Sequence, residues 1–105
     1  GGLWEFPGGK QEADETLEAC LEREIREELG VKIRVGKRIR VVEHEYEKKR
    51  VTLHFFLCRL LDSPDIRGLQ GQEIRWVRSG DLSSFRFPPP DHSVIEHLQA
   101  LGDPP

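Results

Sequence analysis

The sequence predicts an α+β domain in which a mixed β-sheet is sandwiched between helices, an α/β/α arrangement. Apolar residues recur at helical spacing near the start of the chain and again near its end. Between these two segments, apolar and charged residues alternate as they do in β-strands. The length of 105 residues suits a single domain over residues 1–105.

The composition argues against several classes of protein. Sixteen Lys and Arg residues against nineteen Asp and Glu residues give a net charge of −3 at pH 7, so binding to a nucleic-acid polymer is not expected. No apolar stretch approaches the roughly 20 residues of a membrane span, and no signal peptide is visible. Cys20 and Cys58 fit no metal-ligand spacing and are expected to be buried free thiols in a reducing cytoplasm.

The first predicted element is a short buried strand, Leu3–Phe6, which the turn residues Pro7–Lys10 end. A helix follows from about Asp14 to Leu29, because apolar residues recur there every four positions and form one stripe. Gly30 is well placed to stop this helix, and either Asp14 or Thr16 to cap its N-terminus.

An antiparallel hairpin is predicted next. Val31–Glu45 alternates apolar residues with Lys and Arg, and Gly36 is expected to break or bulge this strand. Glu47–Lys49 supplies a polar reversal before Arg50–Leu60, a strand rich in β-branched and aromatic residues. The Gly- and Pro-containing stretch Asp62–Gln72 is predicted to be a loop.

The last third of the chain is predicted to contain a short strand, Glu73–Val77, and a rigid extended segment, Phe87–Pro90. A second amphipathic helix is predicted over Asp91–Leu101, and Gly102 closes it. Its inward positions are Val94, Ile95, Leu98 and Leu101.

Acidic residues are concentrated in the first predicted helix. Residues 12–28 contain eight acids and only two bases. At 100° per residue, Glu28 and Glu24 lie about 20° and 60° from Leu21, beside the apolar stripe, and Glu27 lies about 120° away. Carboxylates this close repel one another, and a hard divalent cation such as Mg²⁺ or Mn²⁺ removes that repulsion. The spacing alone leaves open an acidic surface helix whose carboxylates pair with its own arginines.

The residues around these acids resemble a known family motif. The string runs Gly9, five residues, Glu15, seven residues, Arg23-Glu24-Ile25, one residue, Glu27-Glu28, one residue, Gly30-Val31. It resembles the box of the Nudix hydrolase family at every fixed position, including the aliphatic ones.

This resemblance implies a loop–helix–loop that binds a divalent metal ion, Mg²⁺ or Mn²⁺, and a diphosphate. The enzymes of the family hydrolyse a nucleoside diphosphate linked to another group. The resemblance assigns catalysis and metal binding to Glu24, Glu27 and Glu28, with the backbone carbonyl of Gly8 or Gly9 beside them.

The resemblance also implies roles next to the metal site. Glu15 and Arg23 are expected to brace the loop against the helix. Lys10 is either a phosphate contact or a solvated loop lysine, and Phe6 matches a position that packs near the base but is equally suited to a plain core aromatic.

Outside the box the chain resembles the MutT-like branch, the 8-oxo-dGTP diphosphatase type, in Leu3–Lys10, Gly71–Val77 and Phe87–Asp91. This branch converts a nucleoside triphosphate to the monophosphate and pyrophosphate, and it removes oxidised purine nucleotides such as 8-oxo-dGTP from the nucleotide pool, a form of DNA repair. Asp91 takes the place of an Asn that hydrogen-bonds the purine edge, and an ionised Asp only accepts hydrogen bonds. A pyrimidine substrate of the dCTP type therefore stays open, as does a simple helix N-cap role for Asp91.

Two further departures from the family pattern bear on activity. Gln70 stands where the family often has a Glu; its amide can coordinate a metal but cannot act as a base, and Glu73 is a possible substitute. The family carries a strand-rich segment before Leu3, so the domain is expected to be N-terminally incomplete. A non-catalytic nucleotide-binding module of a larger DNA-repair protein is the alternative. The expected partner is a nucleoside triphosphate, in a cytoplasmic monomer or homodimer with no membrane contact.

Overall fold

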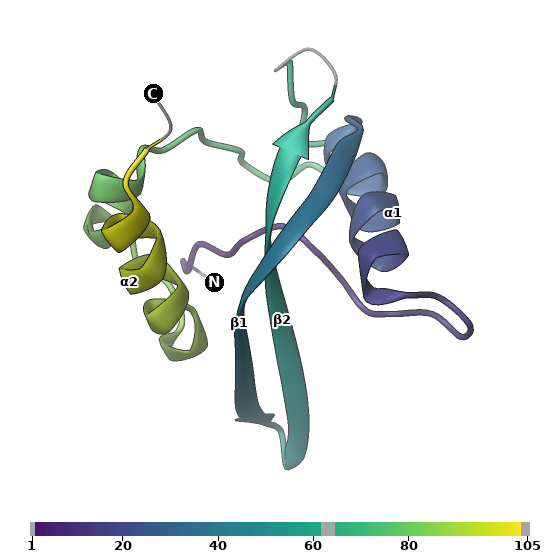
Figure 1. The fold of residues 1–105 in the computed structure, drawn as a ribbon, viewed down its shortest axis with the longest axis horizontal. Coiled ribbons are helices and arrows are strands. Elements are labelled where there is room, and N and C mark those ends of the chain that lie inside the picture. Colours follow the sequence, from purple (N-terminus) through teal and green to yellow (C-terminus); the bar gives the residue numbers. More distant parts are fainter. Residues whose placement is uncertain (1, 62–64, 104–105) are drawn as a thin grey trace. The chain divides into compact units, whose positions relative to one another are not determined.

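A computed structural model describes residues 2–61 and 65–103. Helix and strand content confirm the α+β prediction (Figure 1). In chain order the elements are helix α1 (Leu17–Leu29), strands β1 (Ile33–Tyr46) and β2 (Lys49–Leu60), 3₁₀ turns η1 (Ser79–Ser84) and η2 (Pro89–Asp91), and helix α2 (His92–Leu101). No helix among these residues is both long and apolar enough to cross a bilayer.

The chain folds into two compact units. One contains the residues up to Glu5, Arg38–Phe55 and the residues from Trp76 onward. The other, which we call the α1 unit, contains Phe6–Lys37 and Phe56–Arg75. All the residues of the predicted Nudix box lie in the α1 unit.

Helix α1 has well-defined ends. The Thr16 side chain caps its N-terminus by accepting a hydrogen bond from the Ala19 N–H at 3.0 Å, so Thr16 rather than Asp14 is the cap. Asp14 cannot extend the helix, because its φ of 63° lies in the left-handed region. At the other end Gly30 adopts a left-handed conformation, φ 71°, and donates its N–H to the Arg26 carbonyl, as predicted.

The apolar stripe of α1 forms the core of its unit. Ile25, Leu29 and Val31 are buried together. Partly buried side chains from the strands and the following loop pack against them: Leu21, Ile33, Leu60, Ile66 and Ile74. The helix is therefore held by its apolar face, and its acidic residues lie beside that contact.

Strands β1 and β2 form the predicted hairpin. The residues between them, Glu47 and Lys48, both have positive φ (47° and 65°), as a two-residue hairpin turn requires. The predicted break at Gly36 is wrong, since β1 runs through it without interruption. Gly36 instead permits close approach of the paired strand, because a Cβ there would lie 2.8 Å from the Leu57 carbonyl oxygen.

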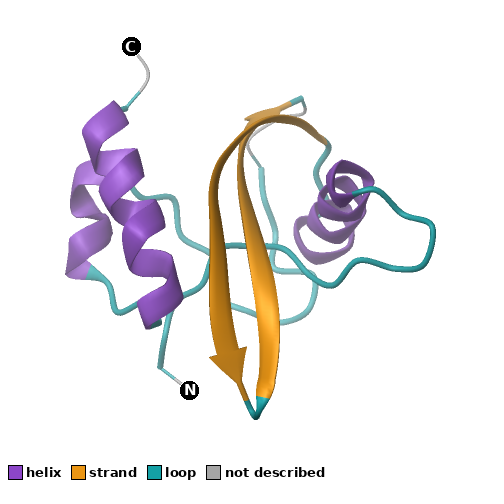
Figure 2. Cartoon of the chain, turned by 60° about the horizontal axis from the view of Figure 1, so that its bottom comes forward, coloured by secondary structure: helices purple, strands orange, loops and turns teal. Residues whose placement is uncertain are grey.

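In the other unit, α2 packs against η1 and η2 (Figure 2). Val94 and Ile95 are buried, as predicted, whereas Leu101 is 56% exposed at the end of the helix. The predicted extended segment is correct only as far as Pro88, because Pro89 already begins the η2 turn.

Two predicted strands are wrong. Neither Leu3–Phe6 nor Glu73–Val77 is a strand, and the sheet within the described residues has the order β1–β2. Leu3 is 53% exposed and Trp76 65% exposed. Strand propensity needs a strand to pair with, and within the described ranges neither segment pairs with β1 or β2; Trp4 instead donates its N–H to the Arg86 carbonyl at 2.7 Å.

Both cysteines are free, as predicted, but only Cys20 is buried. Cys58 lies exposed on β2, so its predicted burial is wrong. The apolar-rich segment around Cys58 favoured burial, but a strand in the two-stranded sheet of the described residues has little to cover its outer face.

Candidate functional site

Arg23 is the centre of an ion-pair network on helix α1. Its guanidinium donates two hydrogen bonds to the Glu15 carboxylate, from Nε to Oε2 at 2.7 Å and from Nη2 to Oε1 at 3.0 Å. The remaining nitrogen, Nη1, lies 2.8 Å from Glu24, 3.3 Å from Glu27 and 3.3 Å from Glu12. One guanidinium therefore gathers four carboxylates, two of which are predicted metal ligands.

The same network fastens the preceding loop to the helix. The Glu15 carboxylate accepts the Glu12 N–H at 2.9 Å, and the Gln11 side chain donates to the Glu15 carbonyl. Arg23 also donates to the Lys10 carbonyl at 3.2 Å. These contacts support the bracing roles predicted for Glu15 and Arg23.

Arg23 also sets the charge state of Glu15. Its hydrogen bonds, followed by that of the Glu12 N–H, lower the pKa of the Glu15 carboxyl from 4.5 to about 2. A carboxyl group with a lowered folded-state pKa stabilises the fold above its unfolded pKa, and this contribution is lost as the pH falls through the folded value.

Glu15→Gln is accordingly expected to lower the Tm at pH 7. The difference from the original protein should shrink as the pH falls from 4.5 to about 2, because both proteins then carry a neutral side chain at this position. Thermal melts across this range measure the effect, with Glu96→Gln, an exposed position of α2, as the control. A Tm difference that stays constant with pH would contradict the ion pair between Glu15 and Arg23.

Glu24 lies against the loop backbone. A Cβ at Gly9 would overlap the Glu24 carboxylate and would lie 2.8 Å from its Cγ. The Oε2 atom faces Gly9, while Oε1 is held by Arg23. The neighbouring Gly8 lies over the Leu21 side chain. This geometry brings Glu24 and the loop glycines together, as the sequence predicts for the metal site.

The three predicted ligands are not equally placed. Among the residues that the structure describes, no three His, Cys, Asp or Glu side chains form a metal-holding cluster. Glu24 is largely buried, Glu28 is half-buried, and the Glu27 side chain is 52% exposed. The helical wheel predicted that Glu24, Glu27 and Glu28 lie close together. In the structure Glu24 and Glu27 share a partner, Arg23.

This smaller set still suits a hard cation. Mg²⁺ usually takes only one or two carboxylates, and phosphate and water oxygens complete its shell. Glu24 and Glu27 each place an oxygen within 3.3 Å of Arg23 Nη1, which is the pairing with the helix's own arginine that the spacing left open, so a metal ion would share these carboxylates with Arg23. A hollow of about 400 Å³ on α1 is lined by Glu27, together with Ala19, Glu22, Arg23 and Arg26.

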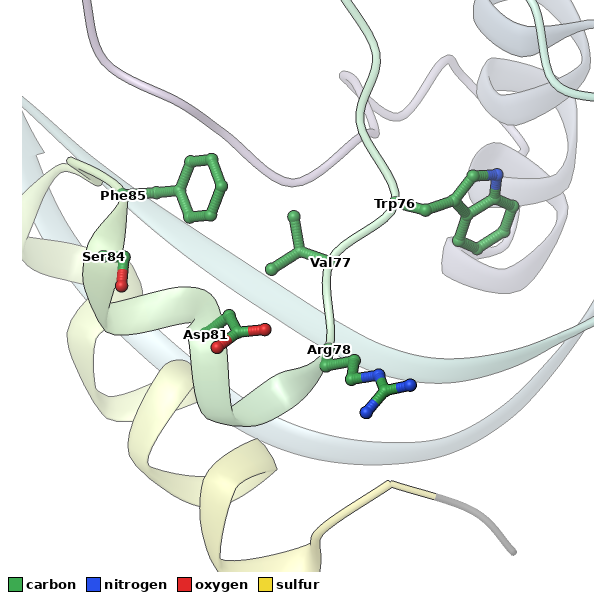
Figure 3. A pocket seen from close by; sticks show the side chains of 6 residues that line it. All are labelled: Trp76, Val77, Arg78, Asp81, Ser84 and Phe85. Atoms are coloured by element: carbon green, nitrogen blue, oxygen red, sulfur yellow. The ribbon is translucent and has the colours of Figure 1, made fainter.

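A second hollow, of about 390 Å³, lies in the other unit (Figure 3). It is lined by Trp76, Val77, Arg78, Asp81, Ser84 and Phe85. Val77 and Phe85 extend toward each other there, whereas the Trp76 ring points away from them. None of the predicted site residues lines this hollow.

Asp91 is the buried charged residue of the described chain, with 6% of its surface exposed. It precedes α2 but makes no side-chain capping hydrogen bond, so the simple N-cap role is not realised. Burial raises the pKa of its carboxyl, the charge of Glu5 raises it further, and His92 and His44 oppose the shift.

The remaining predicted residues differ in support. Phe6 is half-buried and Lys10 exposed in the loop before α1. Glu73 pairs with Arg75 at 3.3 Å, which gives no support to a role as substitute ligand. Gln70 lies in the loop that folds over the end of α1, held there by Gln72, a contact that the sequence did not reveal.

A NUDIX domain model matches residues 1–97. The chain belongs to the NUDIX domain family. Among its relatives, the 8-oxo-dGTP diphosphatase of Buchnera aphidicola subsp. Schizaphis graminum is 37% identical, over 94% of this chain and 74% of that protein. The CTP pyrophosphohydrolase of Escherichia coli K12 is 35% identical, over 95% of this chain and 73% of that protein.

The fold is also similar to that of solved structures. The solution structure of the E. coli ORF135 protein superposes with a TM-score of 0.81 at 32% identity, covering 95% of this chain and 71% of that one. This NUDIX chain is an enzyme acting on acid anhydrides. NUDIX hydrolases generally need a divalent metal ion, which the carboxylate pair on α1 suits.

Proposed function

We propose that this NUDIX chain hydrolyses nucleoside triphosphates to the monophosphate and pyrophosphate, with oxidised purine nucleotides such as 8-oxo-dGTP as its main substrates. The observation that carries the proposal is the Glu24 carboxylate, held between Arg23 and the backbone of Gly9. The 8-oxo-dGTP diphosphatase among the relatives supports the choice of substrate.

We assign the metal, Mg²⁺ or Mn²⁺, to Glu24, Glu27 and Glu28 together with the Gly8 or Gly9 carbonyl. When bound, such an ion neutralises phosphate charge and makes a coordinated water acidic enough to react near neutral pH. Arg23 holds one oxygen of Glu24 and leaves the other facing Gly9, which fixes the direction of the carboxylate. A carboxylate of this set then accepts the proton of the attacking water.

Substrate contacts are proposed for three residues outside this set. Asp91 recognises the base edge, a role supported by its burial and lack of a capping bond. Phe6 packs near the base, and Lys10 contacts phosphate. The enzyme is proposed to act in the cytoplasm as a single-domain monomer or homodimer, and to need no nucleic-acid polymer.

A pyrimidine nucleotide is the second candidate substrate. It is favoured by Asp91, since an ionised carboxylate accepts hydrogen bonds, such as those of a cytosine amino group, but donates none. One relative is named CTP pyrophosphohydrolase, which supports this choice.

A nucleotide panel tests both candidates. We expect pyrophosphate release from 8-oxo-dGTP with Mg²⁺ or Mn²⁺, faster than from dGTP, dCTP or CTP, and no release when the metal is chelated. Faster release from CTP or dCTP would favour the pyrimidine candidate. Binding of nucleotides without release from any of them would contradict the enzymatic proposal and favour a non-catalytic module.

A further inference from the structure

The loop that contains Gln70 is fastened to the last turn of α1. The final carbonyls of a helix have no partner within the helix itself. Here Arg67 donates its N–H to the Leu29 carbonyl at 3.2 Å, and Leu69 donates its N–H to the Glu28 carbonyl at 2.9 Å. The loop thus supplies hydrogen-bond donors to the last carbonyls of α1, including the carbonyl of Glu28, a proposed metal ligand.

Gln72 joins the two parts with both ends of its side-chain amide. Its Nε2 donates to the Glu28 carbonyl at 3.2 Å, and its Oε1 accepts the Gln70 N–H at 2.9 Å. A carbonyl can only accept and a backbone N–H can only donate, so these two partners fix the orientation of the amide. Glu28 and Gln70 are therefore connected through one side chain.

Two glycines let the loop turn tightly enough for this contact. Gly71 has a φ of 79°, and its N–H donates to the Gly68 carbonyl at 3.1 Å. A Cβ on Gly68 would overlap the Gln72 carbonyl oxygen. The glycines close the turn, and Gln72 is brought back over the helix end.

We propose that Gln72 is a positioning residue that holds Gln70 in a fixed place beside Glu28. This inference rests on the proposed function, because it matters for catalysis only where Glu28 binds the metal. Gln72 contacts the Glu28 backbone and not its carboxylate, so it acts through the place of the loop. With the Gln70 backbone fixed in this way, its side-chain carbonyl would be available as an oxygen ligand for a divalent metal.

Gln72→Leu, which removes both hydrogen bonds at similar size, is the first test. We expect kcat to fall about 10-fold, as for loss of a group that orients a metal ligand, with KM within about twofold. Hydrogen exchange at the Leu69 and Gln70 amides should become faster, and Mn²⁺ binding to the nucleotide-free protein, followed by electron paramagnetic resonance, should weaken. Gln99→Leu on α2, which loses only a hydrogen bond to Ser83, is the matched control.

Gln72→Glu tests the hydrogen bond donated by Nε2 separately from the one accepted by Oε1. It keeps an acceptor for the Gln70 N–H but cannot donate to the Glu28 carbonyl when ionised. We expect the loss in kcat to be at least as large as in Gln72→Leu, because the ionised carboxylate would face the Glu28 carbonyl oxygen with no hydrogen to donate. A rate like that of the original protein would overturn the proposal.

A double-variant cycle shows whether Gln72 acts through Gln70. If it does, Gln70→Ala combined with Gln72→Leu is no slower than Gln70→Ala alone, whereas independent roles would multiply the two losses. Multiplied losses would overturn the proposal. Should the original protein hydrolyse no nucleotide, the proposed function fails, and unchanged amide exchange and Mn²⁺ binding in Gln72→Leu would separately overturn the positioning role.

Discussion

Glu27→Gln and Glu28→Gln are each expected to slow nucleotide hydrolysis by several orders of magnitude. Each change keeps the size of the side chain and removes the negative charge that holds the divalent metal. Changes to groups that only orient a metal ligand reduce activity by about 10- to 100-fold, so loss of a ligand itself should exceed that range. Rates with saturating Mg²⁺, together with Mn²⁺ affinity from electron paramagnetic resonance, measure the effect.

The fold should tolerate these changes. The Glu27 side chain is half-exposed, and its contact with Arg23 is one of several that Arg23 makes. The Tm is therefore expected to change little, which separates loss of catalysis from loss of folding. Glu18→Gln, on the exposed first turn of the same helix, should retain the full rate. Activity retained in both glutamine variants would remove the metal role and leave these acids as surface charges.

Asp91→Asn is expected to change which base the enzyme prefers. An Asn side chain both donates and accepts, whereas an ionised Asp only accepts. A hydrogen bond to a charged group contributes about 1.5–3 kcal/mol, so kcat/KM for 8-oxo-dGTP relative to CTP should rise about 10-fold or more. The measurement is the ratio of the two values in each protein. An unchanged ranking across the nucleotide panel would contradict base recognition by this residue.

The same variant has a stability signature that is independent of substrate. Burial raises the folded-state pKa of Asp91 above 3.8, so its favourable contribution exists below that pH and is lost as the pH rises through the folded value. The Asn side chain stays neutral throughout. Asp91→Asn should therefore melt at a higher temperature than the original protein at pH 7, with the advantage vanishing below pH 3.8.

Local sequence patterns predicted the elements that local physics fixes. Apolar residues recurring every four positions predicted helix α1, and Gly30 predicted its end, because glycine adopts the left-handed conformation that ends a helix at little energetic cost. The polar reversal between the strands gave the hairpin, since its two turn residues have positive φ. The segments Leu3–Phe6 and Glu73–Val77 were predicted wrongly, because a strand depends on a neighbour that its own residues do not specify.

The candidate site divides in the same way. Sequence spacing placed the acids of the box on one helix, since the helical period sets which residues are neighbours on its surface. It did not reveal that Arg23 would draw Glu24 and Glu27 to a single nitrogen. This contact depends on the side-chain rotamers of Arg23, Glu24 and Glu27, and these depend in turn on all the carboxylates that Arg23 can reach.

What the sequence by itself determined is therefore the family, helix α1 and the identity of the carboxylates, all of which follow from residues close together in the chain. The tertiary structure alone decided that Gln72 reaches the Glu28 carbonyl and that Asp91 is buried without capping its helix. The first of these contacts spans 44 residues of sequence. Contacts over such distances form only when the chain closes its loops, and no local periodicity encodes them.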